Sequence, residues 1–526
     1  MTGDPQPGSE QMCDALSRRG SYPHRPAEVQ VRETHISWVF LAGELAYKLK
    51  KPLVLDFVDY GTRARRRAMC EEEVRLNRRL APDIYLGVRG VALTDGCAQL
   101  TAADDPRAAD FVVEMRRYDE RRTLAARLER GELAREEVQA VGGALARFHA
   151  DAAPVHPVEA PVLTVARRFE RNMHELLASV EQRGEIGRVL ALERFAHAFI
   201  TGDAQTFQAR ASRGCVREGH GDLRAEHVLV NGAVQIVDCV EFDRALRELD
   251  VADDLAFLVF DLAARDGARF GKVLVDAYRD AGGDPGEESL IAFYAAYRAL
   301  VRAKVALVRA RQLPPTSGQR AEESAHARDL ILLAESFAWH ARLPLVIVVC
   351  GVPASGKSQL ACALAELSGL PHLSSDVVRK QLAGVRSTER APAESYSAQW
   401  NARTYCELGR RASRALGSSR GAIVDASFRH LADRQAFAAA LGAAVRLVFI
   451  ECQAPRAILA ERAARRERDP HRVSDADAAV VMREQQSWEP LDEVPANAHL
   501  ALRTDRRLED IMSDVLALLD RRLAAA

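Results

Sequence analysis

The segment from Leu343 to Ser358 restricts the fold of this 526-residue chain more than any other. It reads LPLVIVVC and then GVPASGKS, an apolar run that leads into a loop with the spacing GxxxxGK[ST], and a helical sequence follows. In a strand–loop–helix unit of this kind, backbone N–H groups enclose a polyphosphate at the positive end of the helix. We therefore predict a phosphate-binding loop made of Gly351, Val352, Pro353, Ala354, Ser355, Gly356, Lys357 and Ser358.

This loop predicts ATP and Mg²⁺ as cofactors. The ammonium group of Lys357 is expected to reach the β- and γ-phosphates, and the hydroxyl of Ser358 to hold the metal ion. Three strand-like runs, VIVVC, GAIVDAS and VRLVFIEC, alternate with helical stretches, as in a parallel α/β sheet. We predict that residues 341–526 form an α/β P-loop NTPase domain with a parallel sheet.

This region resembles the AAA-type small P-loop kinases, a group that includes polynucleotide kinase and zeta toxins. The first pattern that carries the resemblance is the run SSDVVRK, which supplies Asp376 and Arg379. The resemblance implies that Asp376 accepts the proton of an attacking hydroxyl and that Arg379 binds the acceptor. An ordinary helix cap is the alternative for the serine and aspartate of this run.

Charged residues elsewhere in this domain suggest further roles. Asp425 closes the apolar run AIVD, where a carboxylate can orient Mg²⁺ or its water shell. The run ILAERAARRERD places Arg462, Arg465 and Arg466 on one helix. They resemble lid arginines that neutralise charge between transferring phosphates, although a solvated basic face is an equal alternative.

A second constellation lies in the first half of the chain. GHGDLRAEHVLV, followed by QIVDCVEF, resembles the aminoglycoside phosphotransferase family and, more remotely, protein kinases. The resemblance covers residues 25–340 and implies an α+β bilobal, protein-kinase-like domain. By this resemblance Asp222 is the catalytic base or orienting carboxylate, and Asp238 binds the metal ion.

His227 departs from that family pattern. A kinase catalytic loop has Asn five residues after its Asp, as a ligand of the second Mg²⁺, whereas this chain has His227. We assign His227 to the metal site, where it binds directly, acts through water, or positions Asp222. Because Mg²⁺ prefers oxygen ligands, a nucleotide-binding pseudoenzyme remains an alternative for this module.

A lysine-bearing strand is expected to complete the N-terminal nucleotide site. Alternation with a period of two points Lys48 and Lys50 to the same face of LAYKLKKP, with Lys48 the first choice for the phosphates and Lys50 the second. Glu73 resembles the helix glutamate that pairs with such a lysine, and Glu71 and Glu72 are close rivals.

Composition narrows the binding partners and cellular locations that remain possible for this chain. The counts of 73 Lys+Arg and 74 Asp+Glu give a net charge of −1, which does not favour nucleic acid, although a local basic cleft would be compatible with it. The sequence contains no apolar run of about 18 residues, so it predicts no membrane-spanning helix. The nine cysteines show no CxxC pair, which suggests reduced thiols and a cytoplasmic location. Residues 1–24 are expected to be a flexible segment or a lone helix.

Our main hypothesis is an ATP-dependent kinase with two modules that phosphorylate hydroxyl groups of a small molecule. One alternative is a regulatory protein whose first module binds ATP without catalysis. Another is an enzyme of the zeta-toxin or polynucleotide-kinase type, which acts on nucleotide sugars or nucleic-acid ends. The sequence indicates neither the acceptor nor the oligomeric state.

Overall fold

The computed structural model describes the chain apart from residues 1–8, 56–57, 157–158, 443–444, 468–477 and 525–526. The chain forms two compact units, and each consists of two separate stretches of sequence. The first unit contains Met1–Glu159 and Gln208–Glu287, and the second contains Ala160–Phe207 and Glu288–Ala526.

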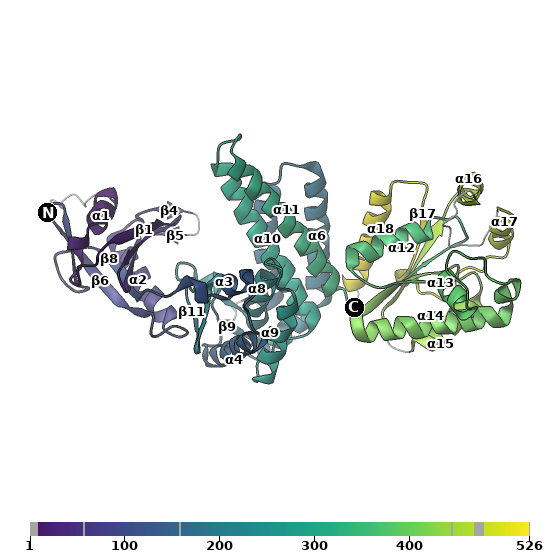
Figure 1. The fold of residues 1–526 in the computed structure, drawn as a ribbon, viewed down its shortest axis with the longest axis horizontal. Coiled ribbons are helices and arrows are strands. Elements are labelled where there is room, and N and C mark those ends of the chain that lie inside the picture. The colour runs from purple at the N-terminus through teal and green to yellow at the C-terminus, as the bar shows by residue number, and fades with distance from the viewer. Residues whose placement is uncertain (1–8, 56–57, 157–158, 443–444, 468–477, 525–526) are drawn as a thin grey trace. The chain divides into compact units, whose positions relative to one another are not determined.

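A six-stranded antiparallel sheet organises the first unit, in the order β1-β2-β3-β8-β6-β7 (Figure 1). Because side chains alternate along each strand, the sheet presents apolar residues to both faces. Helix α2 (Arg63–Asn77) packs Cys70 and Val74 against one face. The strands are β1 (Val29–Glu33), β2 (Ser37–Ala42), β3 (Leu45–Lys50), β6 (Tyr85–Thr94), β7 (Cys97–Ala102) and β8 (Ala108–Arg116).

The other face of this sheet is covered by α1 (Ser9–Leu16). Met12 and Leu16 are buried there against Phe40 and Tyr47, and the hydroxyl of Tyr22 donates to the carbonyl oxygen of Leu16 at 2.6 Å. Of the two expected outcomes, a flexible segment or a lone helix, residues 9–24 show a helix, α1, whose apolar side chains are buried on the sheet. Residues 1–8 lie outside the described residues.

The rest of the first unit is mainly helical and carries three short two-stranded sheets. The loop with His220, Gly221 and Asp222 lies between β9 and β10. The elements are β4 (Val54–Leu55), β5 (Val58–Asp59), α3 (Leu124–Glu129), α4 (Arg135–Asp151), β9 (Val216–Glu218), β10 (Val228–Asn231), β11 (Ala233–Ile236), β12 (Glu248–Asp250), α8 (Val251–Ala263) and α9 (Arg269–Asp280). Helix α7 (Ala204–Ser212) passes from one unit to the other.

A five-stranded parallel sheet forms the core of the second unit, in the order β14-β15-β13-β16-β17. This confirms the predicted parallel α/β fold. The strands are β13 (Leu345–Cys350), β14 (His372–Ser374), β15 (Gly421–Asp425), β16 (Leu447–Gln453) and β17 (His499–Arg503). The helices are α5 (Pro161–Leu177), α6 (Arg183–Gly202), α10 (Glu288–Gln312), α11 (Gly318–Ala341), α12 (Lys357–Ser368), α13 (Ser375–Leu382), α14 (Ala398–Ser419), α15 (Leu431–Leu441), α16 (Arg456–Glu467), α17 (Ala478–Gln486) and α18 (Leu508–Ala524).

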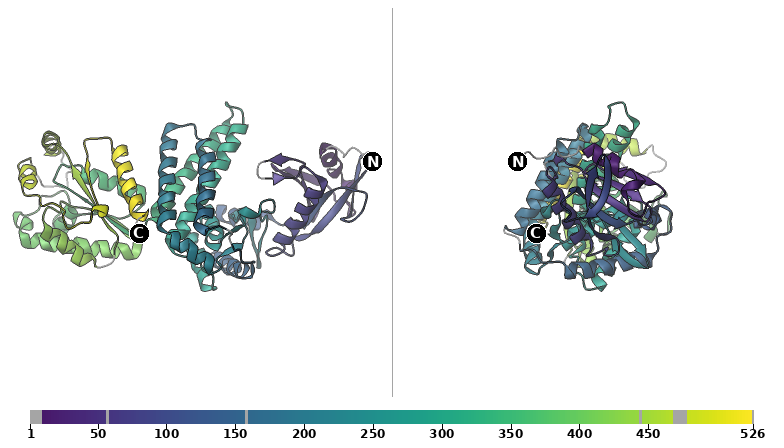
Figure 2. Two further views of the ribbon diagram at one scale, coloured as in Figure 1. Left: turned by 180° about the vertical axis from the view of Figure 1, so that it is seen from behind. Right: turned by 90° about the vertical axis from the view of Figure 1, so that its left-hand side faces the viewer.

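Helices cover both faces of the parallel sheet, so β13 is buried along its whole length. Ile347 and Val349 face α12 and α18, and Val346 and Val348 face α14 and α15. Figure 1 shows these two helix layers on opposite sides of the sheet, and Figure 2 shows them from behind, with the yellow α18 opposite the green α14 and α15.

The last helix joins the parallel sheet to helices that precede residue 341 in the sequence. Helix α18 packs against α6, and a Cβ atom at Gly202 would lie 1.9 Å from the carbonyl oxygen of Leu523. The buried guanidinium of Arg342 pairs with Asp520 at 2.5 Å and lies over the ring of Phe195. The compact units therefore divide the chain differently from the limits 25–340 and 341–526, which remain a prediction about domains.

We expect Gly202→Ala to destabilise the second unit by at least about 1–3 kcal/mol, because the added methyl group displaces the backbone of α18. Differential scanning calorimetry measures the effect. Gly187→Ala on the same helix is the matched control, since nothing lies within 4 Å of its new methyl group. Alanine there raises helix propensity by roughly 0.5–1 kcal/mol. Equal melting temperatures for the two variants would contradict the close packing of α6 and α18.

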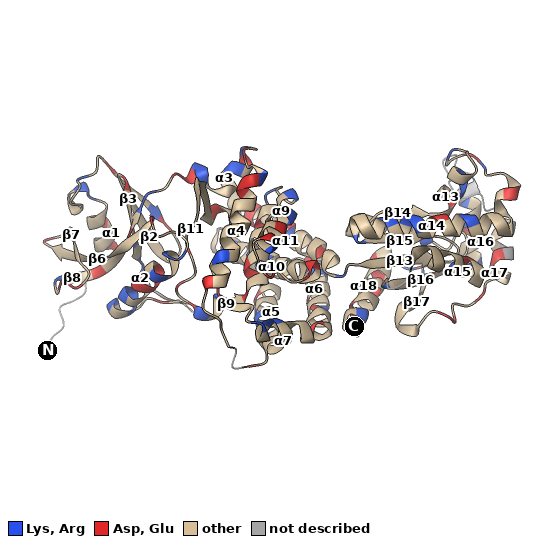
Figure 3. Ribbon diagram, turned by 90° about the horizontal axis from the view of Figure 1, so that it is seen from below, with Lys and Arg blue, Asp and Glu red and all other residues tan. Residues whose placement is uncertain are grey.

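Lys and Arg residues are interspersed with Asp and Glu residues along the described part of each unit, as the blue and red segments of the ribbon in Figure 3 show. Among the described residues, no helix is both long and apolar enough to cross a membrane.

Candidate active sites

The first candidate site lies in the first unit and is formed by strand β3, helix α2 and the segment after β11. Lys48, on β3, extends its Nζ to Glu73 Oε1 at 2.8 Å and to Asp238 Oδ1 at 2.9 Å. Burial alone would lower the pKa of Lys48, but the two carboxylates raise it well above its ordinary value. The structure thus brings together three of the predicted residues, which lie far apart in the sequence.

Lys50 occupies a second, fully buried position on the same face of β3. Its Nζ lies 2.7 Å from Glu73 Oε2 and also pairs with Glu241, whose Oε1 accepts a hydrogen bond from Tyr60 at 2.7 Å. Glu73 therefore bridges both lysines. The sequence analysis missed Glu241. The sequence marks this residue only as an acidic residue three positions after Asp238.

We expect Lys50→Met to destabilise the β3–α2 region by about 3–5 kcal/mol, because it leaves the carboxylates of Glu73 and Glu241 buried beside a single remaining lysine. Hydrogen exchange of the amides in β3 and α2 measures this local stability. Lys272→Met is the control, since that side chain is 74% exposed and should change stability by less than about 0.5 kcal/mol. Unchanged exchange in Lys50→Met would contradict a role for Lys50 in holding Glu73.

Two carboxylates of α8 fix the loop that carries Asp222. Asp254 accepts from the backbone N–H groups of His220 at 2.7 Å and Gly221 at 3.0 Å, and Asp261 accepts from that of Ala225 at 2.8 Å. Gly221 has φ +84°, and a Cβ there would lie 2.9 Å from a backbone oxygen, so the turn requires glycine. The loop is therefore anchored at both ends, with the side chain of Asp222 partly exposed.

Asp238 and His227 lie where the resemblance implies a metal ion. The positive charge of Lys48 lowers the pKa of Asp238 far below its ordinary value, and half of the Asp238 side chain stays exposed. His227 Nε2 lies 3.7 Å from Asp238 Oδ2. An ionised, accessible carboxylate fits Mg²⁺, and the imidazole adds a nitrogen donor beside it.

The second candidate site lies at the carboxyl end of β13. Gly351–Gly356 connects β13 directly to α12, as the sequence predicts, and Gly351 and Gly356 have φ of +139° and +91°. A Cβ at Gly351 would lie 2.5 Å from the carbonyl oxygen of Cys452, so glycine is required where the loop passes β16. Lys357 and Ser358 begin α12, and the described geometry is that of a phosphate-binding loop.

Asp425 lies beside this loop at the end of β15. Burial alone would raise its pKa, but His372 and Lys357 outweigh that effect and the pKa of Asp425 is lowered, with Ser358 a further contributor. The buried Oδ1 of Asp425 has no hydrogen-bond partner among the described residues. An orphaned carboxylate oxygen and a nearby hydroxyl fit a Mg²⁺ ion, which these residues would hold.

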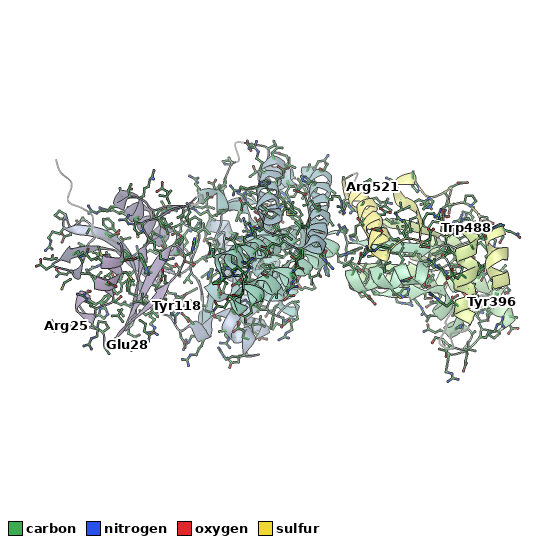
Figure 4. The ribbon with its side chains drawn as sticks, turned by 90° about the horizontal axis from the view of Figure 1, so that it is seen from above. Arg25, Glu28, Tyr118, Tyr396, Trp488 and Arg521 are labelled. Atoms are coloured by element: carbon green, nitrogen blue, oxygen red, sulfur yellow. The ribbon has the colours of Figure 1, made fainter. Side chains whose placement is uncertain are left out.

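The predicted acceptor residues are on α13, in different environments. Asp376 is half-buried in the first turn of the helix, after β14 ends at Ser374. Arg379 is buried and donates to the carbonyl oxygen of Ser395 at 2.6 Å and to Asn401 Oδ1 at 2.7 Å. Its guanidinium also lies over the ring of Tyr396, labelled in Figure 4. The guanidinium group of Arg379 therefore makes most of its contacts within the protein.

The predicted arginines of α16 also lie in different environments. Arg462 donates to the side chain and carbonyl oxygen of Thr504 at 3.1 and 2.8 Å, and a Cβ at Gly356 would lie 3.4 Å from its guanidinium. The predicted Arg465 is exposed. The side chain of Arg466 lies outside the described residues.

Glu484 on α17 is an acidic residue near this site that the sequence analysis missed. Burial raises the pKa of this carboxyl group, while the nearby Arg429, 3.7 Å away, and Lys357 act to lower it. Its Oε2 is buried without a hydrogen-bond partner in the described part of the chain. Nothing in the run VVMREQQ distinguishes this glutamate from a surface residue.

The fold is a protein-kinase-like bilobal domain followed by an α/β P-loop domain with a parallel sheet. A family model described as an AAA domain matches residues 346–491. The chain is 34% identical over 472 residues to "Uncharacterized protein Rv2004c" of Mycobacterium tuberculosis (strain ATCC 25618 / H37Rv), covering 88% of this chain and 91% of that protein. The chain belongs to the same family as this mycobacterial protein.

Parts of this chain are similar in fold to solved structures. A gluconokinase from Sinorhizobium meliloti 1021 is 24% identical, covers 35% of this chain and 95% of its own, and has a TM-score of 0.27. A choline/ethanolamine kinase family protein from Mesorhizobium loti is 17% identical, covers 63% of this chain and 98% of its own, and has a TM-score of 0.39. A putative aminoglycoside phosphotransferase from Ralstonia eutropha JMP134 is 13% identical, with a TM-score of 0.35. The match covers 63% of this chain and 98% of that protein.

Proposed function

We propose that this chain is a Mg²⁺- and ATP-dependent phosphotransferase with two nucleotide sites, which transfer the γ-phosphate to hydroxyl groups of small molecules. The observation that carries the proposal is the convergence of Lys357, Ser358 and Asp425 at a glycine loop between a parallel strand and a helix. Phosphoryl transfer requires charge neutralisation and alignment, and this arrangement supplies a cation, a metal-binding pair and backbone donors.

At the C-terminal site we assign the remaining steps to residues of α13 and α16. Asp376 accepts the proton of the attacking hydroxyl, and Arg379 orients the acceptor through the loop that holds Ser395. Arg462, beside Gly356, neutralises charge on the transferring phosphate, and Arg465 joins it from the exposed face of α16.

At the N-terminal site Lys48, held by Glu73, contacts the phosphates, and Asp238 and His227 hold the metal ion. Asp222 accepts the proton of the acceptor hydroxyl. Arg224 pairs with Asp222 at 3.0 Å and orients this carboxylate in the loop.

One observation favours a second candidate function for the N-terminal module. The pairing of Arg224 with Asp222, together with His227 at the metal position, also suits a module that binds nucleotide without transferring phosphate. In that case ATP binds and no acceptor-dependent turnover arises from this site.

The two functions are separated by a screen with γ-labelled ATP and acceptors that include sugars, aminoglycosides, nucleosides and 5′-hydroxyl oligonucleotides. The full-length chain is used, because helices on both sides of residue 341 pack together in the second unit. Asp238→Ala isolates the C-terminal activity and Lys357→Ala isolates the N-terminal one. If the parent protein and both variants form no labelled product with any of these acceptors, the phosphotransferase proposal is wrong.

A further inference from the structure

The hydrogen bonds of His227 determine which of its ring nitrogens carries a proton. Nδ1 lies 2.9 Å from the carbonyl oxygen of Asp222, and because a carbonyl oxygen only accepts, Nδ1 must donate. Nε2 lies 3.1 Å from Nη2 of Arg224, and because a guanidinium only donates, Nε2 must accept. These two contacts fit the tautomer that carries its proton on Nδ1 and its lone pair on Nε2.

This lone pair lies beside the carboxylate that the nucleotide site offers to a metal ion. Asp238 Oδ2 is 3.7 Å from His227 Nε2, and Glu226 Oε1 is 3.8 Å from it. Metal-binding histidines in proteins commonly donate their other N–H to a backbone carbonyl, which fixes the tautomer and the ring orientation. His227 has this arrangement, with Nδ1 beside the carbonyl oxygen of Asp222.

We propose that His227 Nε2, beside Asp238, is a direct ligand of the divalent ion at the N-terminal nucleotide site, and that this nitrogen makes the site prefer a first-row transition ion such as Mn²⁺ to Mg²⁺. The inference rests on the proposed nucleotide-binding function of this site. When the ion displaces Arg224 from Nε2, the guanidinium keeps Asp222 and Glu226 as partners, so its charge stays compensated.

The preference follows from ligand chemistry. Mg²⁺ prefers oxygen ligands and tolerates imidazole poorly, whereas divalent first-row transition ions accept it. Among the described residues no group of three or more His, Cys, Asp or Glu side chains is arranged to hold a metal ion, so oxygen atoms of the nucleotide and water must complete the coordination. The C-terminal site has the hydroxyl of Ser358 and the carboxylate of Asp425, and provides an internal comparison.

Electron spin-echo envelope modulation of Mn²⁺ tests the proposal, because it detects a directly coordinated imidazole nitrogen. The full-length Lys357→Ala protein is loaded with Mn²⁺ and the ATP analogue AMP-PNP, and His227→Asn and His227→Gln are introduced into it. His372→Gln is the matched control, since His372 Nε2 lies 3.7 Å from Asp425 in the other site, the same separation as His227 from Asp238. Circular dichroism establishes that each variant is folded.

We expect a ¹⁴N modulation that His372→Gln retains and both His227 variants lose. The ratio of Mn²⁺ affinity to Mg²⁺ affinity should also fall by about tenfold or more in the His227 variants. A bound Mn²⁺ without ¹⁴N modulation, or a modulation that survives in folded His227 variants, would overturn the proposal. Neither result depends on catalytic turnover. A protein that shows the modulation but transfers no phosphate would contradict the phosphotransferase function while leaving the metal ligand in place.

Discussion

Lys357→Ala is expected to weaken ATP binding at the C-terminal site roughly 10- to 150-fold, because hydrogen bonds to charged groups contribute about 1.5–3 kcal/mol. Lys357 is buried at the first position of α12, directly after the glycine that ends the loop. Isothermal titration calorimetry with an ATP analogue measures the loss. The experiment is done on a Lys48→Ala background, which removes the lysine proposed to contact the phosphates at the N-terminal site.

Lys304→Ala provides the control for this substitution. Lys304 is in the same unit and pairs with Glu175 at 2.7 Å on the surface, where exposed ion pairs contribute little. Its replacement should leave the affinity for nucleotide unchanged. Equal affinities of the Lys357→Ala and Lys304→Ala proteins would refute the phosphate-loop assignment.

Asp222→Asn is expected to lower N-terminal phosphotransfer by about 10²- to 10⁴-fold, the usual contribution of a general base. The amide cannot accept the proton of the acceptor hydroxyl. The loop should keep its shape, because Asp254 and Asp261 hold its backbone rather than the side chain of Asp222. Turnover is measured in the Lys357→Ala background, in which the C-terminal site is silent.

The matched control is Asp266→Asn in the same unit. Asp266 is exposed at the end of α8 with φ +60°, a conformation that Asn also adopts readily. This variant should keep parental turnover. If the Asp222→Asn protein transfers phosphate as fast as the Asp266→Asn protein, Asp222 is not the base.

Local sequence patterns predicted the parts of both sites that depend on neighbouring residues. The glycine spacing and the apolar run before it fix the loop at residues 351–358, because a short strand–loop–helix unit needs no distant partner. Alternation along β3 placed Lys48 and Lys50 on one face. Helix phase decides among the three glutamates, since Glu73 is buried while Glu71 pairs with Arg67 on the surface.

Contacts between distant segments could not be predicted from one sequence. Glu241 meets Lys50 across 191 positions, and no local periodicity marks a residue that is buried only by such pairing. The helices between residues 160 and 207 belong to the compact unit of the parallel sheet, although their sequences resemble those of any amphipathic helix. Glu484 lay in an ordinary polar helix run for the same reason.

The packing of α18 on α6 has a consequence for how this protein is made. Helix α6 emerges from the ribosome long before Leu523, whose carbonyl oxygen lies nearest to a Cβ atom built at Gly202. Domains generally fold as units during synthesis, with N-terminal segments first. The packing of α6 on α18 can therefore form only after α18 has been synthesised, long after α6 itself.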